Sequence, residues 1–269
     1  MSDALRKRIL TAVVLGAVLL AILLWLPDWV AVAVITLMAL AGAWEWSAFL
    51  RLPAPAWRFA YLALVAALLW AAWRCSASAA GLNLVLAVAV LWWIAALAWI
   101  VFAPRRVSPW SAAAAGVLAL VPSWLALVQL RALPQGAHWL LFALVLVWVA
   151  DIGAFFSGRL FGRVRLAPEV SPNKTWEGVL GGIVVSAPVA IAGSLWFHVP
   201  LISFVPLCLA AVGFSIVGDL TESLLKRFAG MKDSGSIFPG HGGVMDRIDS
   251  ITGAAPVLLL GLTLLGVAA

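Results

Sequence analysis

The sequence predicts an all-α polytopic membrane protein, meaning a chain whose helices cross a lipid bilayer many times. Hydrophobic residues make up 65% of the 269 positions and charged residues only 10%, whereas a soluble domain is about half apolar and about a quarter charged. The apolar residues fall in runs of about 20, the length that a helix needs to cross about 30 Å of hydrocarbon. This composition excludes a soluble globular protein, a disordered chain and a collagen-like repeat.

Nine apolar runs are expected to cross the membrane as helices, because lipid offers the backbone no hydrogen-bond partners. Prolines such as Pro27 and Pro134 mark several of their ends. The weakest division separates the seventh run from the eighth, where only residues 198–200 intervene. We expect the first run to be a retained span, because no clear signal-peptide cleavage site follows it. The expected runs are 9–26, 28–49, 57–73, 82–102, 111–130, 137–156, 178–198, 200–218 and 251–268.

The basic residues predict the orientation of these spans, because cytoplasmic loops of membrane proteins collect Lys and Arg. With the N-terminus in the cytoplasm and nine crossings, only Arg74 and Arg131 of the 17 basic residues fall outside, which leaves 15 on the cytoplasmic side. A false span would move every later loop to the other side and destroy this asymmetry. The charges therefore predict a cytoplasmic N-terminus and a C-terminus outside.

The acidic residues divide the chain into two parts. Residues 1–136 are expected to form a scaffold of about five spans, and residues 137–269 a catalytic region with cytoplasmic loops at 157–177 and 219–250. Of the 11 acidic residues, eight lie between positions 151 and 249: Asp151, Glu169, Glu177, Asp219, Glu222, Asp233, Asp246 and Asp249. The polar chemistry is therefore expected in these two loops.

The second loop combines carboxylates, bases and glycine-rich turns. Asp219, Ser223 and Lys226 have helical spacing, so a continued eighth helix would carry them in one stripe, and Gly230 would end it. Asp246 and Asp249 are three residues apart on one face of the last span. Carboxylates favour a hard cation such as Mg²⁺, and bases beside flexible glycines favour phosphate. The combination indicates a nucleoside triphosphate bound with Mg²⁺.

Three polar features outside that loop are further candidates. Asp151 is embedded in an apolar run, so it needs a partner or a cation. Residues 171–178 have the pattern of the start of a helix, in which Lys174 is placed to bind phosphate as a point charge. Glu45 lies near the end of the second run, where a structural pairing with Arg51 or another base is favoured over a role in the site.

The stretch from Ser223 to Asp249 resembles the signature of the phosphatidate cytidylyltransferase family, also called CDP-diacylglycerol synthase. Residues 218–222 and 171–178 resemble the family as well, and residues 44–46 do so more loosely. The resemblance covers nearly the whole chain and is strongest over 151–257. The signature positions are all matched, by Ser223, Lys226-Arg227, Lys232-Asp233, His241-Gly242-Gly243, Asp246-Arg247 and Asp249.

The resemblance implies an activity that the residues alone do not identify. The family condenses CTP with phosphatidic acid to give CDP-diacylglycerol and pyrophosphate, and it requires Mg²⁺; a second cation and a homodimer are left open. The expected catalytic residues are Asp219, Lys226, Arg227, Asp246, Arg247 and Asp249. The expected substrate-binding residues are Lys174, Ser223, Lys232, Asp233, His241, Gly242 and Gly243. Asp219 and Asp246 are the expected metal ligands, with Asp249, Asp151 and Glu222 as further candidates.

Two other functions remain as alternatives. Transfer of a phospho-sugar to a polyprenyl phosphate also uses Mg²⁺, cytoplasmic aspartates and many spans. A transporter would carry ionisable residues at mid-span and broken helices, whereas the charges here lie mainly at the cytoplasmic ends of the runs. No nucleic-acid partner is expected, because the positive charge is explained by topology. The resemblance implies a bacterial inner-membrane protein whose active site faces the cytoplasm.

Overall fold

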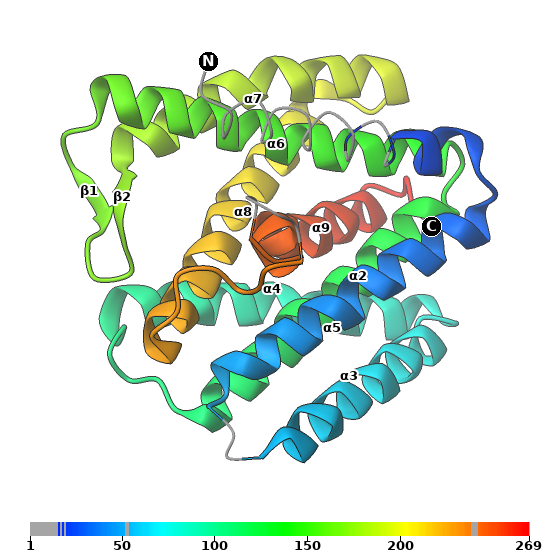
Figure 1. The fold of residues 1–269 in the computed structure, drawn as a ribbon. Coiled ribbons are helices and arrows are strands. Elements are labelled where there is room, and N and C mark those ends of the chain that lie inside the picture. Colours follow the sequence, from blue (N-terminus) through cyan, green and yellow to red (C-terminus); the bar gives the residue numbers. More distant parts are fainter. Residues whose placement is uncertain (1–15, 17, 19, 52–53, 238–241, 269) are drawn as a thin grey trace.

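The protein is a bundle of long helices with one small hairpin on its surface (Figure 1). The computed structural model describes residues 16, 18, 20–51, 54–237 and 242–268. Its elements are α2 (Asp28–Phe49), α3 (Pro55–Cys75), α4 (Ala79–Phe102), α5 (Pro109–Ala132), α6 (Gly136–Phe161), β1 (Arg165–Ala167), β2 (Ser171–Thr175), α7 (Trp176–Phe197), α8 (Leu201–Ala229) and α9 (Met245–Leu264).

The helices α2 to α9 correspond to the second to ninth expected runs. Within the described residues, these eight helices are long and apolar enough to cross a membrane. Half of the first expected run, 9–26, lies outside the described residues, and residues 20–25 are helical. The chain is therefore an integral membrane protein built almost entirely of helices, as the composition predicts.

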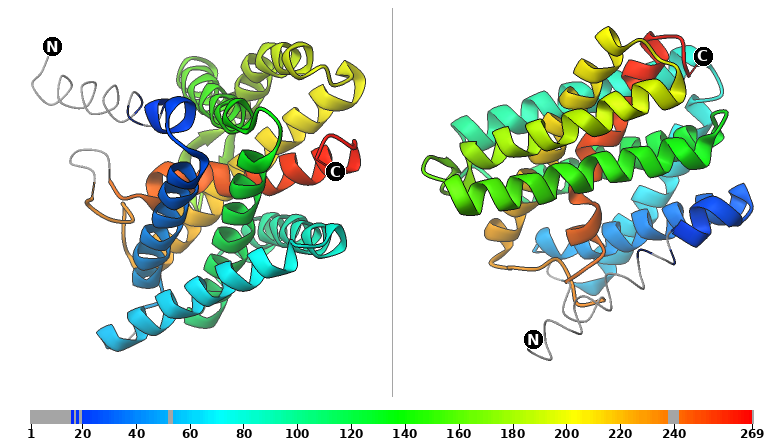
Figure 2. Two further views of the ribbon diagram at one scale, coloured as in Figure 1. Left: turned by 90° about the vertical axis from the view of Figure 1, so that its right-hand side faces the viewer. Right: turned by 90° about the horizontal axis from the view of Figure 1, so that it is seen from above.

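Helix α9 lies at the centre of the bundle. It packs against α8, α5, α4 and α6, and its residues from Ile251 to Leu259 are buried. Helices α6 and α7 run side by side along their lengths (Figure 2). Helices α2 and α5 form another neighbouring pair, which α3 covers (Figure 1). This arrangement brings the beginning of α9 next to the end of α2 and the end of α8.

The purely α-helical prediction is wrong over residues 165–175. Strands β1 and β2 pair there as an antiparallel hairpin, so the start of a helix expected at Ser171 is a strand instead. Pro172 disfavours a helix at this point because it fixes φ and lacks an N–H. Helix α7 begins only at Trp176, where the Thr175 hydroxyl caps it by accepting the N–H of Gly178 at 3.1 Å.

An ion pair links the hairpin to the connection between α4 and α5. Arg105 donates from Nε and Nη2 to the two carboxylate oxygens of Glu169, at 3.0 and 2.8 Å. The hydrogen bond and the negative charge of Glu169 raise the pKa of Arg105 above its ordinary value. Since both side chains are largely exposed, the pair contributes little to overall stability.

Helices α8 and α9 cross so closely that their glycines are sterically required. A Cβ on Gly253 would overlap the carbonyl oxygen of Phe214, and a Cβ on Gly218 would lie 2.5 Å from that of Asp249. Because these neighbours are backbone atoms, a side chain at either position would force the two helices apart. The close crossing fixes the Asp219 turn of α8 against the first turns of α9.

We therefore expect Gly253→Ala to lower the free energy of unfolding by about 1–3 kcal/mol, the usual range for overpacking. Gly213→Ala is the matched control, because this position is also helical but no atom outside its own stretch of helix lies within 4 Å of the point that a Cβ would occupy. Alanine there should be neutral or slightly stabilising. Thermal unfolding of both variants in one detergent checks the difference, and equal midpoints would contradict the close crossing.

Candidate active site

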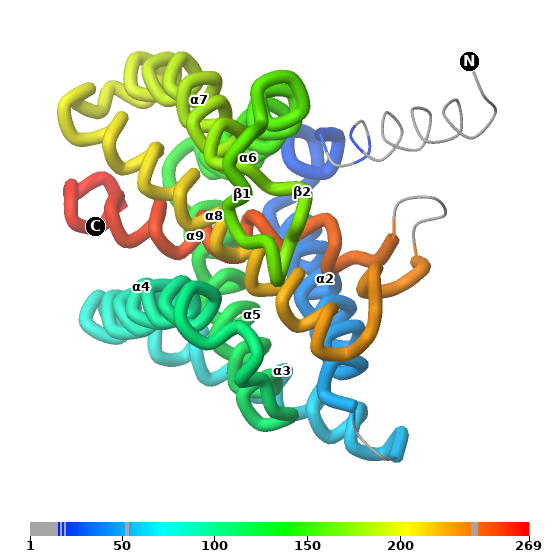
Figure 3. Tube along the Cα trace, turned by 90° about the vertical axis from the view of Figure 1, so that its left-hand side faces the viewer, coloured from blue at the N-terminus to red at the C-terminus, as the bar shows by residue number. Residues whose placement is uncertain are grey.

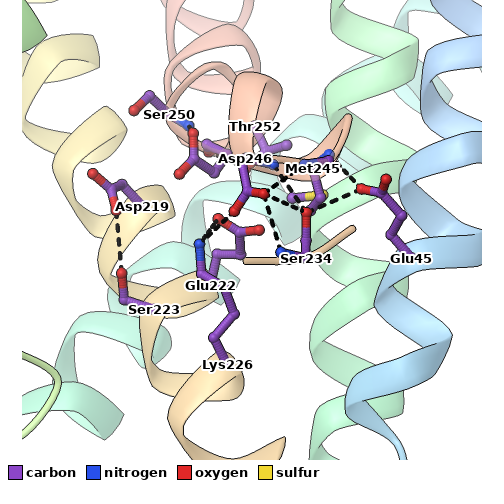
Figure 4. A network of polar contacts seen from close by, with 12 residues as sticks. Glu45, Asp219, Glu222, Ser223, Lys226, Ser234, Met245, Asp246, Ser250 and Thr252 are labelled. Atoms are coloured by element: carbon purple, nitrogen blue, oxygen red, sulfur yellow. Dashed lines mark hydrogen bonds and ion pairs between the residues drawn. The ribbon is translucent and has the colours of Figure 1, made fainter. Parts of the chain in front are cut away.

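The polar stripe predicted on the eighth helix exists. Helix α8 continues to Ala229 and places Asp219, Glu222, Ser223 and Lys226 along its last turns. Gly230 ends the helix in a left-handed conformation with φ 72°. The stripe faces the first turn of α9 and the segment that joins the two helices (Figure 4).

Lys226 lies at the centre of the site. Its Nζ donates to Glu222 Oε2 at 2.9 Å and to Asp246 Oδ1 at 2.8 Å. The Lys226 side chain is only 11% exposed, and those of Glu222 and Asp246 are 0% and 9% exposed. Because charges removed from water need partners, these three groups depend on one another for their ionised forms. They form a fixed unit that joins α8 to α9.

The second oxygen of Asp246 holds the segment before α9. Asp246 Oδ2 accepts the backbone N–H of Ser234 at 3.0 Å, the hydroxyl of Ser234 at 3.0 Å and the N–H of Gly243 at 2.7 Å. Gly242 has φ 81°, and a Cβ there would overlap Asp246 Oδ2. The glycines expected near the substrate thus also allow the chain to wrap closely around this carboxylate.

Glu45 is a buried part of the same network, which corrects the favoured pairing with a base. Glu45 is 4% exposed, and its carboxylate accepts the N–H groups of Val244 at 3.0 Å and Met245 at 2.8 Å. The Ser234 hydroxyl lies 3.0 Å from both Glu45 and Asp246, so its single proton is shared between the two carboxylates. Arg51 instead lies over the ring of Phe228.

The physical reason for this contact is that the buried N-terminus of α9 has no capping side chain of its own. The first N–H groups of a helix have no intrahelical acceptor and carry a partial positive charge. The N-cap residue Val244 supplies no capping side chain. Glu45 of α2 supplies the missing acceptor from a distant part of the sequence. An acid at membrane depth was the only sequence signal for this contact.

A second group of charges surrounds Asp219. Lys174 of β2 forms an ion pair with Asp219, and the Ser223 hydroxyl donates to Asp219 Oδ1 at 3.3 Å. Asp249 lies beside the carboxylates of Asp219 and Glu222. Asp151 of α6 lies close enough to Asp219 and Lys174 for their charges to act on it. We call the carboxylates of Asp151, Asp219, Glu222, Asp246 and Asp249, with Lys174 and Lys226, the carboxylate cluster.

The structure does not bring every expected residue into this cluster. Lys232, Asp233 and Arg247 are exposed at the surface. Arg227 is also exposed and lines a separate cavity with Arg105. His241 lies outside the described residues. The functional assignments of all these positions therefore remain predictions.

The carboxylate cluster is compatible with Mg²⁺ but does not form a complete protein cage. Among the described residues, no three His, Cys, Asp or Glu side chains are placed to hold a metal by themselves. Mg²⁺ in nucleotide enzymes is commonly bound by one or two carboxylates together with substrate phosphates. Glu222 Oε1 is buried without a hydrogen-bond partner in the described structure. The oxygen donors fit a hard cation that shares its coordination with a phosphate substrate.

These features define a class of polytopic membrane protein in which carboxylates and lysines from several helices and a hairpin converge in one polar cluster. The model of a family described as "Cytidylyltransferase family" matches residues 6–265. The chain belongs to this family.

Two curated relatives match over nearly their full lengths, and both are named phosphatidate cytidylyltransferase. The one from Haemophilus influenzae is 39% identical, over 94% of this chain and 96% of its own. The one from Pseudomonas aeruginosa is 40% identical, over 94% of this chain and 95% of its own. A relative of the same name from Bacillus subtilis is 43% identical over about half of each chain, 51% and 52%.

Proposed function

We propose that the protein transfers the cytidylyl group of CTP to phosphatidic acid and forms CDP-diacylglycerol and pyrophosphate. The observation that carries this proposal is its near-full-length similarity to two proteins named phosphatidate cytidylyltransferase. The carboxylate cluster supports it independently, because carboxylates and lysines gathered beside membrane spans suit a charged substrate that must meet a lipid.

The reaction is a displacement at phosphorus. An oxygen of the phosphatidic acid phosphate attacks the α-phosphorus of CTP and forms a new P–O bond. The bond from the α-phosphorus to the oxygen that bridges to the β-phosphorus breaks, and pyrophosphate leaves with that oxygen. Both substrates are anions, so the protein must position them and neutralise their charge.

The two lysines of the cluster have different tasks in this reaction. Lys226 is fixed between Glu222 and Asp246, so it offers a positioned positive charge. Lys174 is carried by the hairpin and pairs with Asp219, so it can exchange this partner for a substrate phosphate. Gly243 and His241, two positions earlier in the sequence, are proposed to contact the departing pyrophosphate.

Asp219 and Asp246 are the proposed Mg²⁺ ligands, and Asp249, which lies beside Asp219, is proposed as a further ligand. Asp219 accepts one donor on each oxygen and Asp246 Oδ1 accepts only Lys226, so each of these carboxylates retains lone pairs that could bind a cation. When bound, Mg²⁺ supplies charge neutralisation for the triphosphate. A second cation remains part of the proposal, and so does a homodimer.

The proposed location is the bacterial inner membrane, with the N-terminus and the carboxylate cluster on the cytoplasmic side and the C-terminus outside. The distribution of the basic residues supports this orientation. It also places the cluster where nucleotides are available, while the acyl chains of phosphatidic acid remain in the bilayer.

One assay tests the activity directly. Purified protein in lipid nanodiscs is given labelled CTP, phosphatidic acid and Mg²⁺, and the lipid product is separated. We expect labelled CDP-diacylglycerol, its loss with EDTA and its recovery when excess Mg²⁺ is added. Product formed only from a UDP-sugar and a polyprenyl phosphate would overturn the proposal, and activity that persists after chelation would overturn the metal requirement.

A further inference from the structure

A second polar feature lies outside the carboxylate cluster. A cavity of about 400 Å³ is bounded by the last turns of α8, the connection between α4 and α5, and the hairpin. Figure 3 shows the face of the molecule that carries the hairpin. We call this space the arginine cavity. Its lining includes Arg105, Glu169, Arg227, Val107, Leu224 and Phe228.

The arginine cavity has an excess of positive charge. Arg105 and Arg227 contribute two guanidinium groups, and Glu169 contributes one carboxylate. Glu169 is held by Nε and Nη2 of Arg105, which leaves Nη1 of that group free of this contact. Within the described part of the chain, no carboxylate lies within ion-pair distance of Arg227. The cavity therefore attracts an anion.

The neighbouring apolar residues indicate what kind of anion fits. Leu224 and Phe228 are on α8, and Val107 is on the connection between α4 and α5. A free inorganic anion would gain nothing from this apolar lining, whereas a phosphate attached to an apolar chain would use both parts. Guanidinium groups are suited to phosphate because their N–H groups match two of its oxygens.

We propose that the arginine cavity binds the phosphate monoester headgroup of the acceptor lipid, an inference that rests on the proposed function. Lys226 and Arg227 are consecutive on α8, so they point to different faces of the helix. Lys226 belongs to the carboxylate cluster and Arg227 to the arginine cavity. One helix thus carries cations toward two separate places, Lys226 toward the carboxylate cluster and Arg227 toward the arginine cavity, where the lipid phosphate would be recognised before it reaches the nucleotide.

Opposite charge changes in one ion pair test this assignment. Arg105→Gln and Glu169→Gln both break the same pair, so a purely structural contact would give both variants the same direction of change. A phosphate site predicts that Arg105→Gln raises the KM for phosphatidic acid about five- to tenfold, whereas Glu169→Gln leaves it unchanged or lowers it. The KM for CTP should stay within about twofold in both variants.

Each alternative result overturns the proposal. A KM for phosphatidic acid that rises in both variants would indicate a structural contact between the hairpin and the α4–α5 connection. A selective rise in the KM for CTP would assign the cavity to the triphosphate. If Arg105→Gln and Arg227→Gln both leave the KM for phosphatidic acid unchanged, the cavity does not recognise the lipid.

A binding experiment without CTP separates this inference from the proposed function. Dioctanoyl phosphatidate, dioctanoylglycerol and glycerol 3-phosphate are titrated calorimetrically into the purified full-length protein. We expect the phosphatidate to bind most tightly, and Arg105→Gln to weaken it about five- to tenfold. Equal binding of glycerol 3-phosphate would indicate a site for free phosphate, and equal binding of dioctanoylglycerol would exclude phosphate recognition. Arginine-dependent binding by a protein without transferase activity would reject only the proposed function.

Discussion

Asp246→Asn is expected to lower turnover about a hundredfold or more while the protein still inserts into the membrane. The carboxylate now accepts Lys226 on one oxygen and three donors from Ser234 and Gly243 on the other. An asparagine keeps only one accepting oxygen, and its NH₂ group would face either the lysine or the backbone donors. The change also removes a negative charge beside Lys226 and a proposed Mg²⁺ ligand.

The measurement is kcat for CDP-diacylglycerol formation, together with the thermal unfolding midpoint of the same preparation. Breaking a buried ion pair is destabilising, so a lower midpoint is expected as well, and the assay is run at a temperature where the variant remains folded. Asp28→Asn is the matched control, because it removes an ion-paired carboxylate at the opposite end of α2 from the site. Asp28 pairs with Arg131, and it lies about 25 Å along the helix from Glu45, at about 1.5 Å for each of 17 residues. Wild-type turnover by folded Asp246→Asn protein would overturn the assignment.

The parts of the site that depend on local periodicity could be predicted from the sequence. The spacing of Asp219, Ser223 and Lys226 matches a helical turn and predicts one stripe, and α8 carries them in that way. Gly230 is predicted to end the helix because glycine readily adopts positive φ, and it does so at φ 72°. Helical spacing and chain termination are local properties, so neither requires knowledge of the fold.

The contacts that join distant segments could not be predicted in this way. Glu45 accepts hydrogen bonds from Val244 and Met245, which are 199 and 200 positions away in the sequence. No pattern within one segment specifies which helix end a buried acid will cap. Arg227 presents a related difficulty: its place in a basic pair suggests the same site as Lys226, but adjacent helical residues face different directions. The hairpin could not be predicted, because strands of three and five residues are too short to show a clear alternation of apolar and polar residues.

Glu45→Ala is expected to abolish most activity and to lower the free energy of unfolding by about 2–6 kcal/mol. The change leaves two buried N–H groups of α9 without an acceptor, and each unsatisfied donor costs about 1–3 kcal/mol. It also releases Ser234, whose hydroxyl lies 3.0 Å from both Glu45 and Asp246. Asp246 would then lose part of its support although the mutated residue is remote in sequence. Thermal unfolding and kcat measured on the same protein check both effects.

Glu45→Gln distinguishes the acceptor role of the side chain from its charge. Val244 and Met245 donate to different oxygens of Glu45, so the single carbonyl oxygen of glutamine replaces only one of these acceptors and should recover part of the stability that alanine loses. The Gln NH₂ group cannot accept the Ser234 hydroxyl in place of the missing oxygen, and we expect kcat to recover less than stability does. If Glu45→Ala matched the wild type in both midpoint and kcat, the contact would not position Asp246. A parallel recovery of both quantities in Glu45→Gln would limit Glu45 to capping α9.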